Sequence, residues 1–205
     1  MDLLENYKKT WSNQVEMPCK FSALEIYKMA HSKSSSIVKW IFIIGILEFV
    51  ILNSLYFFMD MEEAYKQYKK MGLEDFVFYS QIVAYAILFY FLAQFYLNYR
   101  QISTTDSTKQ LMKKILKTRK TVRNYVFFNL SYLGLTMIVV TIASIKINID
   151  HLNNKQILLV VFLMLIATII ILGLFWLFYQ LLYGILLKKL NRNFKELAKL
   201  ESEIS

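Results

Sequence analysis

The sequence predicts an all-α protein: a four-transmembrane-helix bundle with cytoplasmic amphipathic juxtamembrane helices. Three observations predict this fold class. The 205 residues are 57% apolar and only 19% charged, which is outside the usual range of soluble domains. Four apolar segments are long enough to supply the roughly 20 helical residues that cross a hydrocarbon core, namely 37–58, 76–98, 124–145 and 157–187. Lys and Arg are concentrated in alternate connections between them.

This charge bias predicts the topology. Of the 24 Lys and Arg, 19 lie in residues 1–39, 99–123 and 188–205. Short loops rich in Lys and Arg stay on the cytoplasmic side, so both termini and the central connection are expected inside. The polar pieces are each too short to bury a core of their own, which predicts one membrane domain, 37–187, and no separate soluble domain.

The N-terminal segment, 1–36, is expected to be cytoplasmic and amphipathic. Residues 2–14 can form a helix suited to a headgroup surface. Ser22 and Glu25 have capping-box spacing, which predicts that a second helix starts there. The serine-rich stretch 32–36 is expected to link this helix to the first span. The segment suits either packing on the lipid and bundle or docking of a cytoplasmic partner.

Between the first two spans, acidic residues precede basic ones, a pattern that favours a short helix. Glu62 and Lys66 have the i,i+4 spacing of an ion pair, and Gly72 closes the run. Tyr65 and Tyr68 are expected in the outer aromatic belt. No metal-ligand clustering is present here, and the helix is expected to be structural.

The connection 99–123 begins with cap-forming residues at 103–108 and continues as a basic amphipathic helix that leads into the third span. Beside a membrane, such a helix attracts anionic headgroups, so we expect lipid rather than nucleic acid as its partner. A grip on an acidic protein is the other interpretation. The expected lipid contacts are Lys109, Lys113, Lys114, Lys117, Arg119, Lys120 and Arg123.

The fourth span, 157–187, is longer than a straight crossing requires, so it is expected to tilt, bend or protrude. Gly173 and Gly184 permit close approach of a neighbouring helix, although no span contains a GxxxG motif. The tail, 188–205, has helically spaced apolar residues and is expected to continue as a cytoplasmic amphipathic helix.

Glu48 is the single charged residue in the middle of a span, near the midpoint of 37–58. A carboxyl group there is costly, which favours an orientation towards the bundle and a polar partner. The functional interpretation is a proton or cation site, and the structural one is a carboxyl group that holds helices together. The candidate partners for an intramembrane polar site are Asn53, Gln81, Gln94, Asn129, Tyr132 and Gln180.

Catalysis has little support in the sequence. His31 and His151 are predicted on opposite sides of the membrane, and no zinc-protease, phosphate-loop or catalytic-triad pattern is present. We therefore expect no enzyme activity, no metal and no cofactor. Cys19 is alone and is expected to be a small structural thiol. Tyrosines of the second span, such as Tyr79 and Tyr85, could stack on a hydrophobic cation, although packing is the more common role.

Residues 25–31, 34–44 and 47–49 resemble a group of small four-span bacterial membrane proteins of unknown role. The resemblance implies a bacterial cytoplasmic membrane. The label carotene oxygenase is sometimes attached to such proteins, but that activity needs four histidines on iron, whereas this chain has two histidines. A glutamate in the first of four spans is also similar to the small multidrug-resistance exporters, where it exchanges protons for a cationic drug; only Glu48 corresponds.

The function expected from the sequence is interaction, tethering or regulation through a basic cytoplasmic face made by 1–36, 99–123 and 188–205. The expected partners are anionic lipid and a cytoplasmic protein, and a homo-oligomer is compatible with the sequence. The alternative is a proton-coupled transporter of a small molecule or cation that uses Glu48.

Overall fold

The computed structural model describes residues 22–58, 61–105, 107–148 and 153–204. The expectations for the helix over 2–14, for Cys19 and for His151 lie outside the described residues. Within them the structure is helical, and the elements in order are α2 (Ala23–Ser54) with a 3-10 turn (Leu55–Phe57), α3 (Met61–Lys70), α4 (Glu74–Ser103), α5 (Thr108–Asn148), α6 (Asn154–Tyr179), a π-helix (Gln180–Gly184) and α7 (Ile185–Ile204).

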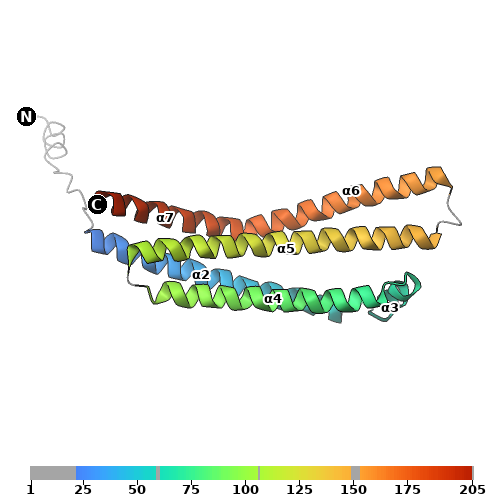
Figure 1. The fold of residues 1–205 in the computed structure, drawn as a ribbon, viewed down its shortest axis with the longest axis horizontal. Coiled ribbons are helices and arrows are strands. Elements are labelled where there is room, and N and C mark those ends of the chain that lie inside the picture. The colour runs from blue at the N-terminus through green and yellow to red at the C-terminus, as the bar shows by residue number, and fades with distance from the viewer. Residues whose placement is uncertain (1–21, 59–60, 106, 149–152, 205) are drawn as a thin grey trace, which may run out of the picture.

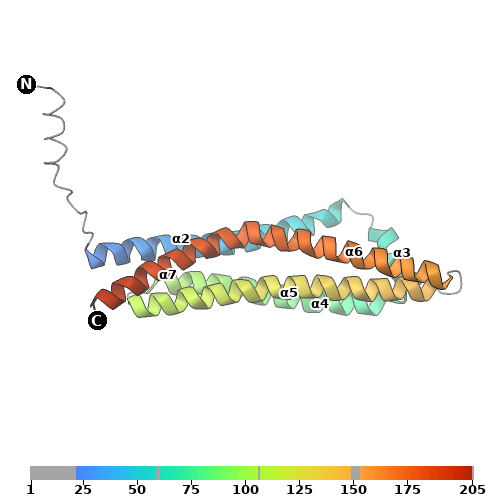
Figure 2. The same ribbon diagram turned by 90° about the horizontal axis from the view of Figure 1, so that it is seen from above.

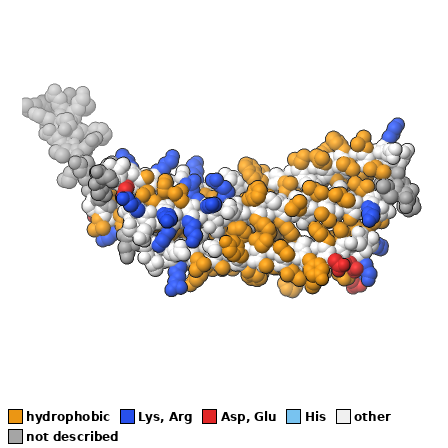
Figure 3. Space-filling model, viewed as in Figure 1, with side chains coloured by type: hydrophobic (Ala, Val, Ile, Leu, Met, Phe, Trp, Pro, Cys, Tyr) orange, Lys and Arg blue, Asp and Glu red, His pale blue; other side chains and the backbone are white. Residues whose placement is uncertain are grey.

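In the described part of the chain, four helical stretches are long and apolar enough to cross a membrane, as the sequence predicts. They run side by side along the long axis of the molecule (Figures 1 and 2), with α2 packed against α4 and α7, and α5 packed against α4, α6 and α7. We call the end that holds residues 22–39, 99–123 and 188–204 the basic end, and the other the α3 end. Lys and Arg side chains gather over the basic end, whereas hydrophobic side chains dominate the rest of the face shown in Figure 3.

Local sequence signals set several helix ends. The capping box before α2 is confirmed: the Ser22 hydroxyl accepts from the Glu25 amide at 3.2 Å, and the Glu25 carboxylate accepts from the Ser22 amide at 2.8 Å. In α3, Lys66 pairs with Glu62 at 2.7 Å, as the i,i+4 spacing predicts. Gly72 turns the chain into α4 with φ 63°, a conformation that favours glycine.

The serine-rich stretch 32–36 is not the expected link, because α2 runs through it without interruption. Ser34 is fully buried, and its hydroxyl accepts a hydrogen bond from the Asn193 amide of α7 at 3.1 Å. Serine is a weak helix former, but here a small polar side chain fits between two closely packed helices. Tertiary packing therefore overrides the local preference.

The basic segments are parts of longer helices. Residues 108–123 form the first part of the continuous α5, and 188–204 lie within α7, which runs along the bundle (Figure 1). Their apolar faces meet in a core of their own, which we call the basic-end core, formed by Ala30, Val38, Ile102, Leu111, Ile115, Leu190 and Leu197. Segments too short to bury a core singly thus do so together.

A second core lies next along the bundle and is rich in aromatic residues; its buried members are Ile41, Phe91, Phe95, Val122, Tyr125, Tyr179 and Tyr183. Towards the α3 end, α6 lies along α5 and diverges from α2 (Figures 1 and 2). Most large side chains of α6 are exposed, Leu158 by 72%. In an apolar helix this exposure fits contact with lipid.

The fourth span bends, which is one of the three outcomes that its length predicts. The bend lies at the π-helix between α6 and α7 (Figure 1). Insertion of a π turn is a recognised cause of helix kinks. The bend directs α7 along α2 at the basic end and lets α6 follow α5 at the α3 end.

Candidate functional site

Glu48 is held inside the aromatic core by two tyrosines from the far end of the chain. The Tyr179 hydroxyl donates to Glu48 Oε1 at 2.7 Å, and the Tyr183 hydroxyl donates to Oε2 at 2.9 Å. The glutamate is only 5% exposed. Both carboxyl oxygens therefore have a donor, which meets the strong need for partners that a buried carboxyl group has. We call these three residues the Glu48 clamp.

The π-helix positions the two donors of the clamp. It begins at Gln180, directly after Tyr179, and includes Tyr183, so the tyrosines are separated by one widened turn. Their rings stack with centroids 6.2 Å apart and planes 25° apart. Single π turns inside α-helices are frequent at functional sites. The coincidence of a π turn with the one carboxyl group inside the apolar spans marks this place as the candidate site.

Aromatic rings enclose the clamp. Tyr125 of α5 packs edge-on against Tyr179 and Tyr183, with centroids 6.2 and 5.9 Å away. Phe91 and Phe95 of α4 pack edge-on against Tyr125 at 5.5 and 5.4 Å. Edge-to-face contacts of this kind add about 0.5–1.5 kcal/mol each beyond burial. The clamp is thus a polar site buried among aromatic rings, with Glu48, Tyr179 and Tyr183 each no more than 5% exposed.

The register of the helices sets the distance from the clamp to the basic residues. Glu48 is nine residues from Lys39, or about 13 Å along α2, but its neighbour Tyr125 is only two residues from Arg123. The clamp therefore lies nearer to a basic residue along α5 than along α2, because the four spans are not level with one another.

None of the partners expected from the sequence is hydrogen-bonded to Glu48 among the described contacts. The Asn53 amide oxygen accepts from Tyr85 at 2.6 Å, and Tyr132 contacts Ser80 at 3.4 Å. Asn129 donates to the carbonyl of Tyr125 in its own helix. Gln81 and Gln94 are half-buried on α4, and Gln180 is exposed. Asn53, Asn129 and Tyr132 thus make separate contacts and do not form one site with Glu48.

The clamp tyrosines were missed by sequence reasoning, although a signal for them exists. Tyr179 and Tyr183 are spaced i,i+4 in the longest apolar span. A tyrosine hydroxyl that is buried needs a hydrogen-bond partner, and Glu48 needs donors. Two hydroxyl groups on one helix face at the right depth match that need.

The basic residues expected to touch lipid are distributed unevenly. Lys113, Lys117, Lys120 and Arg123 are exposed, while Arg119 is half-buried. Lys109 pairs with Glu201 of α7 at 3.3 Å. Lys114 has a structural role: its ammonium group donates to the Gln101 carbonyl at 2.9 Å and to the Thr105 hydroxyl, and so fastens the turn between α4 and α5.

The same turn is fastened from α2. The Tyr27 hydroxyl donates to the Thr105 carbonyl at 2.8 Å, and His31 Nε2 lies 2.8 Å from the carbonyl oxygen of Ile102. His31 thus bonds the C-terminal end of α4, where carbonyl groups need donors. Among the residues that the structure describes, no group of three or more His, Cys, Asp or Glu could hold a metal ion.

Comparison with known proteins gives a family and no relative of known role. No curated protein and no solved structure matches the chain. A family model described as a domain of unknown function, DUF8845, matches residues 24–202. The match covers all four spans, the Glu48 clamp and the basic-end core. The chain belongs to the DUF8845 family.

Proposed function

We propose that this protein anchors an acidic soluble partner at a bacterial cytoplasmic membrane, with both termini cytoplasmic and the basic end as a non-catalytic docking platform. One observation carries the proposal: the basic helices continue the axes of the spans and fold as a bundle around the basic-end core. A helix that projects from a membrane presents most of its charge to the solvent rather than to lipid.

The reach of lipid supports this choice of partner. A bilayer adds only about 5–7 Å of headgroup region on each side of its hydrocarbon core. Lys113 is ten residues from Arg123, or about 15 Å along α5. Lys109 is 14 residues from Arg123, or about 21 Å along α5. Headgroups meet the basic residues nearest the apolar zone, such as Lys120, Lys188 and Lys189. The distal residues are out of their reach.

The part of the basic end around Lys113 and Lys117, which we call the distal face, also carries positive charge that the fold does not neutralise. Within the described part of the chain, no ion pair engages Lys113 or Lys117, and both are exposed. Unpaired charge of one sign raises the encounter rate with a partner of opposite charge. An acidic protein surface is the partner that this chemistry favours.

The test uses the full-length protein in lipid nanodiscs, incubated with cytosol and cross-linked before mass spectrometry. The variant Lys113→Gln/Lys117→Gln removes distal charge, and Lys188→Gln/Lys189→Gln removes the same charge beside the membrane. We expect an acidic partner that cross-links to residues of the basic end, is lost with the distal variant and is retained with the other. Identical cross-linked proteins for wild type and both variants would contradict the proposal.

The Glu48 clamp favours a second function, proton-coupled transport of a small molecule or cation. A carboxyl group inside a membrane bundle is a functional candidate by default, and here it coincides with a π turn. In this conformation the carboxyl group is enclosed, so transport would require the α6 side of the clamp to open.

Flux in proteoliposomes tests this second function. Glu48→Gln keeps the shape of the side chain and removes its ability to carry a proton. A transporter should then lose proton-coupled flux while its melting temperature stays within a few degrees of the wild type. Equal flux in the variant and the wild type would rule out a coupling role for Glu48.

A further inference from the structure

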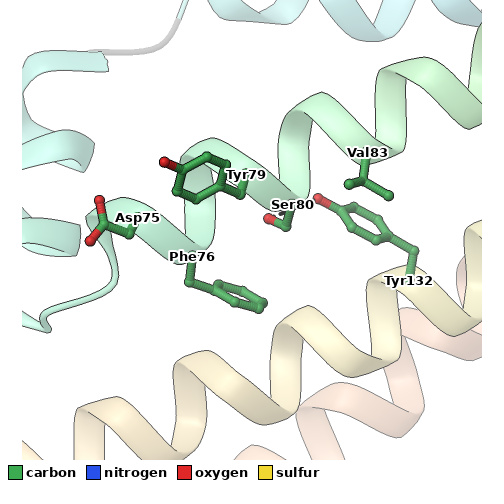
Figure 4. Close-up of a pocket in the computed structure, with 6 residues that line it drawn as sticks. All are labelled: Asp75, Phe76, Tyr79, Ser80, Val83 and Tyr132. Carbon is green, nitrogen blue, oxygen red and sulfur yellow. Dashed lines mark hydrogen bonds between the residues drawn. The ribbon is translucent and has the colours of Figure 1, made fainter.

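A groove far from the clamp lies between α4 and α5, towards the α3 end. It encloses about 400 Å³ and is lined by Asp75, Phe76, Tyr79, Ser80, Val83 and Tyr132. Figure 4 shows Ser80 and Val83 facing Tyr132 from the opposite helix, with Asp75 at the far end of the groove. Phe76, Tyr79 and Val83 expose 37%, 64% and 55% of their surface, so the groove is open along its length.

The groove changes character along α4. Asp75 lies in the first turn, at the edge of the apolar span, and Val83 lies eight residues further in, or about 12 Å along the helix. In the described parts of the chain no hydrogen bond or ion pair engages the Asp75 carboxylate, whereas its neighbour Glu74 is paired with Lys69 at 3.8 Å. An unpaired anionic mouth thus leads to a largely apolar floor, in which the hydroxyls of Ser80 and Tyr132 contact each other.

The aromatic rings add a preference for positive charge. Tyr79 is four residues after Asp75, on the same helix face. Phe76 follows Asp75 directly, and Tyr132 lines the groove from α5. Aromatic faces attract cations and recognise alkylated ammonium groups in particular. The anionic mouth, the aromatic lining and the apolar floor occur in the order in which an amphiphile at a membrane surface presents its head and tail.

We propose that this groove binds an amphiphilic cation, with an alkylammonium head between Asp75 and Tyr79 and an alkyl tail along Val83 and Tyr132. An anionic amphiphile is repelled by the carboxylate. An uncharged one fills the floor without using the mouth. The site is separate from the basic end and from the Glu48 clamp, so the test of this proposal does not depend on the function of either.

The test is photolabelling of the full-length protein in nanodiscs whose lipids have zwitterionic or uncharged headgroups. The probe is a trimethylammonium amphiphile with a diazirine in its alkyl chain, and the labelled peptides are mapped by mass spectrometry. We expect labelling to concentrate around residues 76–83 and 132. Dodecyltrimethylammonium should compete with the probe, whereas dodecyl maltoside and dodecyl sulfate should not.

Two variants and one matched control complete the test. Asp75→Asn should weaken competition by dodecyltrimethylammonium about three- to fivefold, and Tyr79→Leu by about two- to fivefold. Glu74→Gln removes the same charge one residue away, and it should change the competition by dodecyltrimethylammonium less than about twofold. Melting temperatures establish that each variant is folded. Labelling spread evenly over the lipid-facing helices, equal competition by dodecyl maltoside, or equal effects of Asp75→Asn and Glu74→Gln would overturn the proposal.

Discussion

At the scale of single residues, the clamp explains how the bundle tolerates Glu48. The carboxyl group bonds two hydroxyls that are 131 and 135 residues away in the sequence. Removal of one partner from a buried polar pair costs more than the pair contributes, because the remaining group has lost its water. The three side chains should therefore behave as a unit when they are mutated.

Tyr179→Phe and Tyr183→Phe should each lower the free energy of unfolding by about 1–3 kcal/mol, because each leaves one Glu48 oxygen without its donor. Denaturation in mixed detergent micelles measures this change. Tyr132→Phe is the control: its hydroxyl contacts Ser80 at 3.4 Å, a long hydrogen bond, and its loss should cost less than about 0.5 kcal/mol. Equal losses in all three variants would contradict the clamp.

Replacement of the whole clamp should cost less than breaking it. Glu48→Leu alone leaves two buried hydroxyls unpaired, and we expect a loss of about 2–5 kcal/mol. Adding Tyr179→Phe and Tyr183→Phe to Glu48→Leu should recover most of that loss, because an apolar set of similar volume needs no partners. Unfolding of the single, double and triple variants measures the recovery. A triple variant as unstable as the sum of its parts would show that the residues act independently.

The sequence alone identifies Glu48 but not its partners. Its location in an apolar span is a local property and can be read directly. The pairing with Tyr179 and Tyr183 depends on the register of α2 against the fourth span and on the π turn that widens the spacing between the tyrosines. Neither is encoded in a short stretch, so polar residues elsewhere in the spans were equally plausible partners.

At the scale of helices, close packing of α2 against α4 sets the geometry around the clamp. Gly45 lies one turn before Glu48, and a Cβ atom there would meet Leu92 Cδ2 at 3.1 Å and Phe95 Cδ2 at 3.2 Å. These distances are shorter than an ordinary van der Waals contact. A side chain at this position would push the two helices apart and carry Glu48 away from its donors.

Gly45→Val should therefore destabilise the bundle by about 1–3 kcal/mol through overpacking, and thermal unfolding in detergent measures the loss. Gly173→Val makes the same change where a Cβ atom meets nothing within 4 Å, and it should stay within about 0.5 kcal/mol of the wild type. A harmless Gly45→Val would mean that the α2–α4 contact is looser than described.

Local sequence patterns predict the ends of the helices better than they predict which residues continue a helix. The capping box at Ser22 and the pairing of Glu62 with Lys66 depend on residues a few positions apart, and both are confirmed. The serines at 32–36 are misleading, because only the partner helix α7 shows that Ser34 belongs in a core. Local chemistry predicts where helices begin, and tertiary contacts decide where they continue.

At the scale of the whole molecule, the bundle is longer than a membrane is thick. The 41 residues of α5 span about 61 Å, against about 40–45 Å for a bilayer with its headgroups. The sequence predicts the number of spans and their charge bias, but not that the polar segments pack together. That association requires three segments from distant parts of the chain, each too short to fold alone.

The depth of α5 residues relative to the bilayer tests the central claim most directly. Spin labels are attached at Lys113→Cys and at Lys120→Cys in a Cys19→Ser background, and their accessibility to oxygen and to a water-soluble nickel complex is measured in liposomes with anionic lipid. We expect the label at 113 to be fully accessible to the nickel complex and the label at 120 to lie at headgroup depth. Headgroup depth at both positions would show that the basic helix lies on the membrane, and would contradict the projecting basic end.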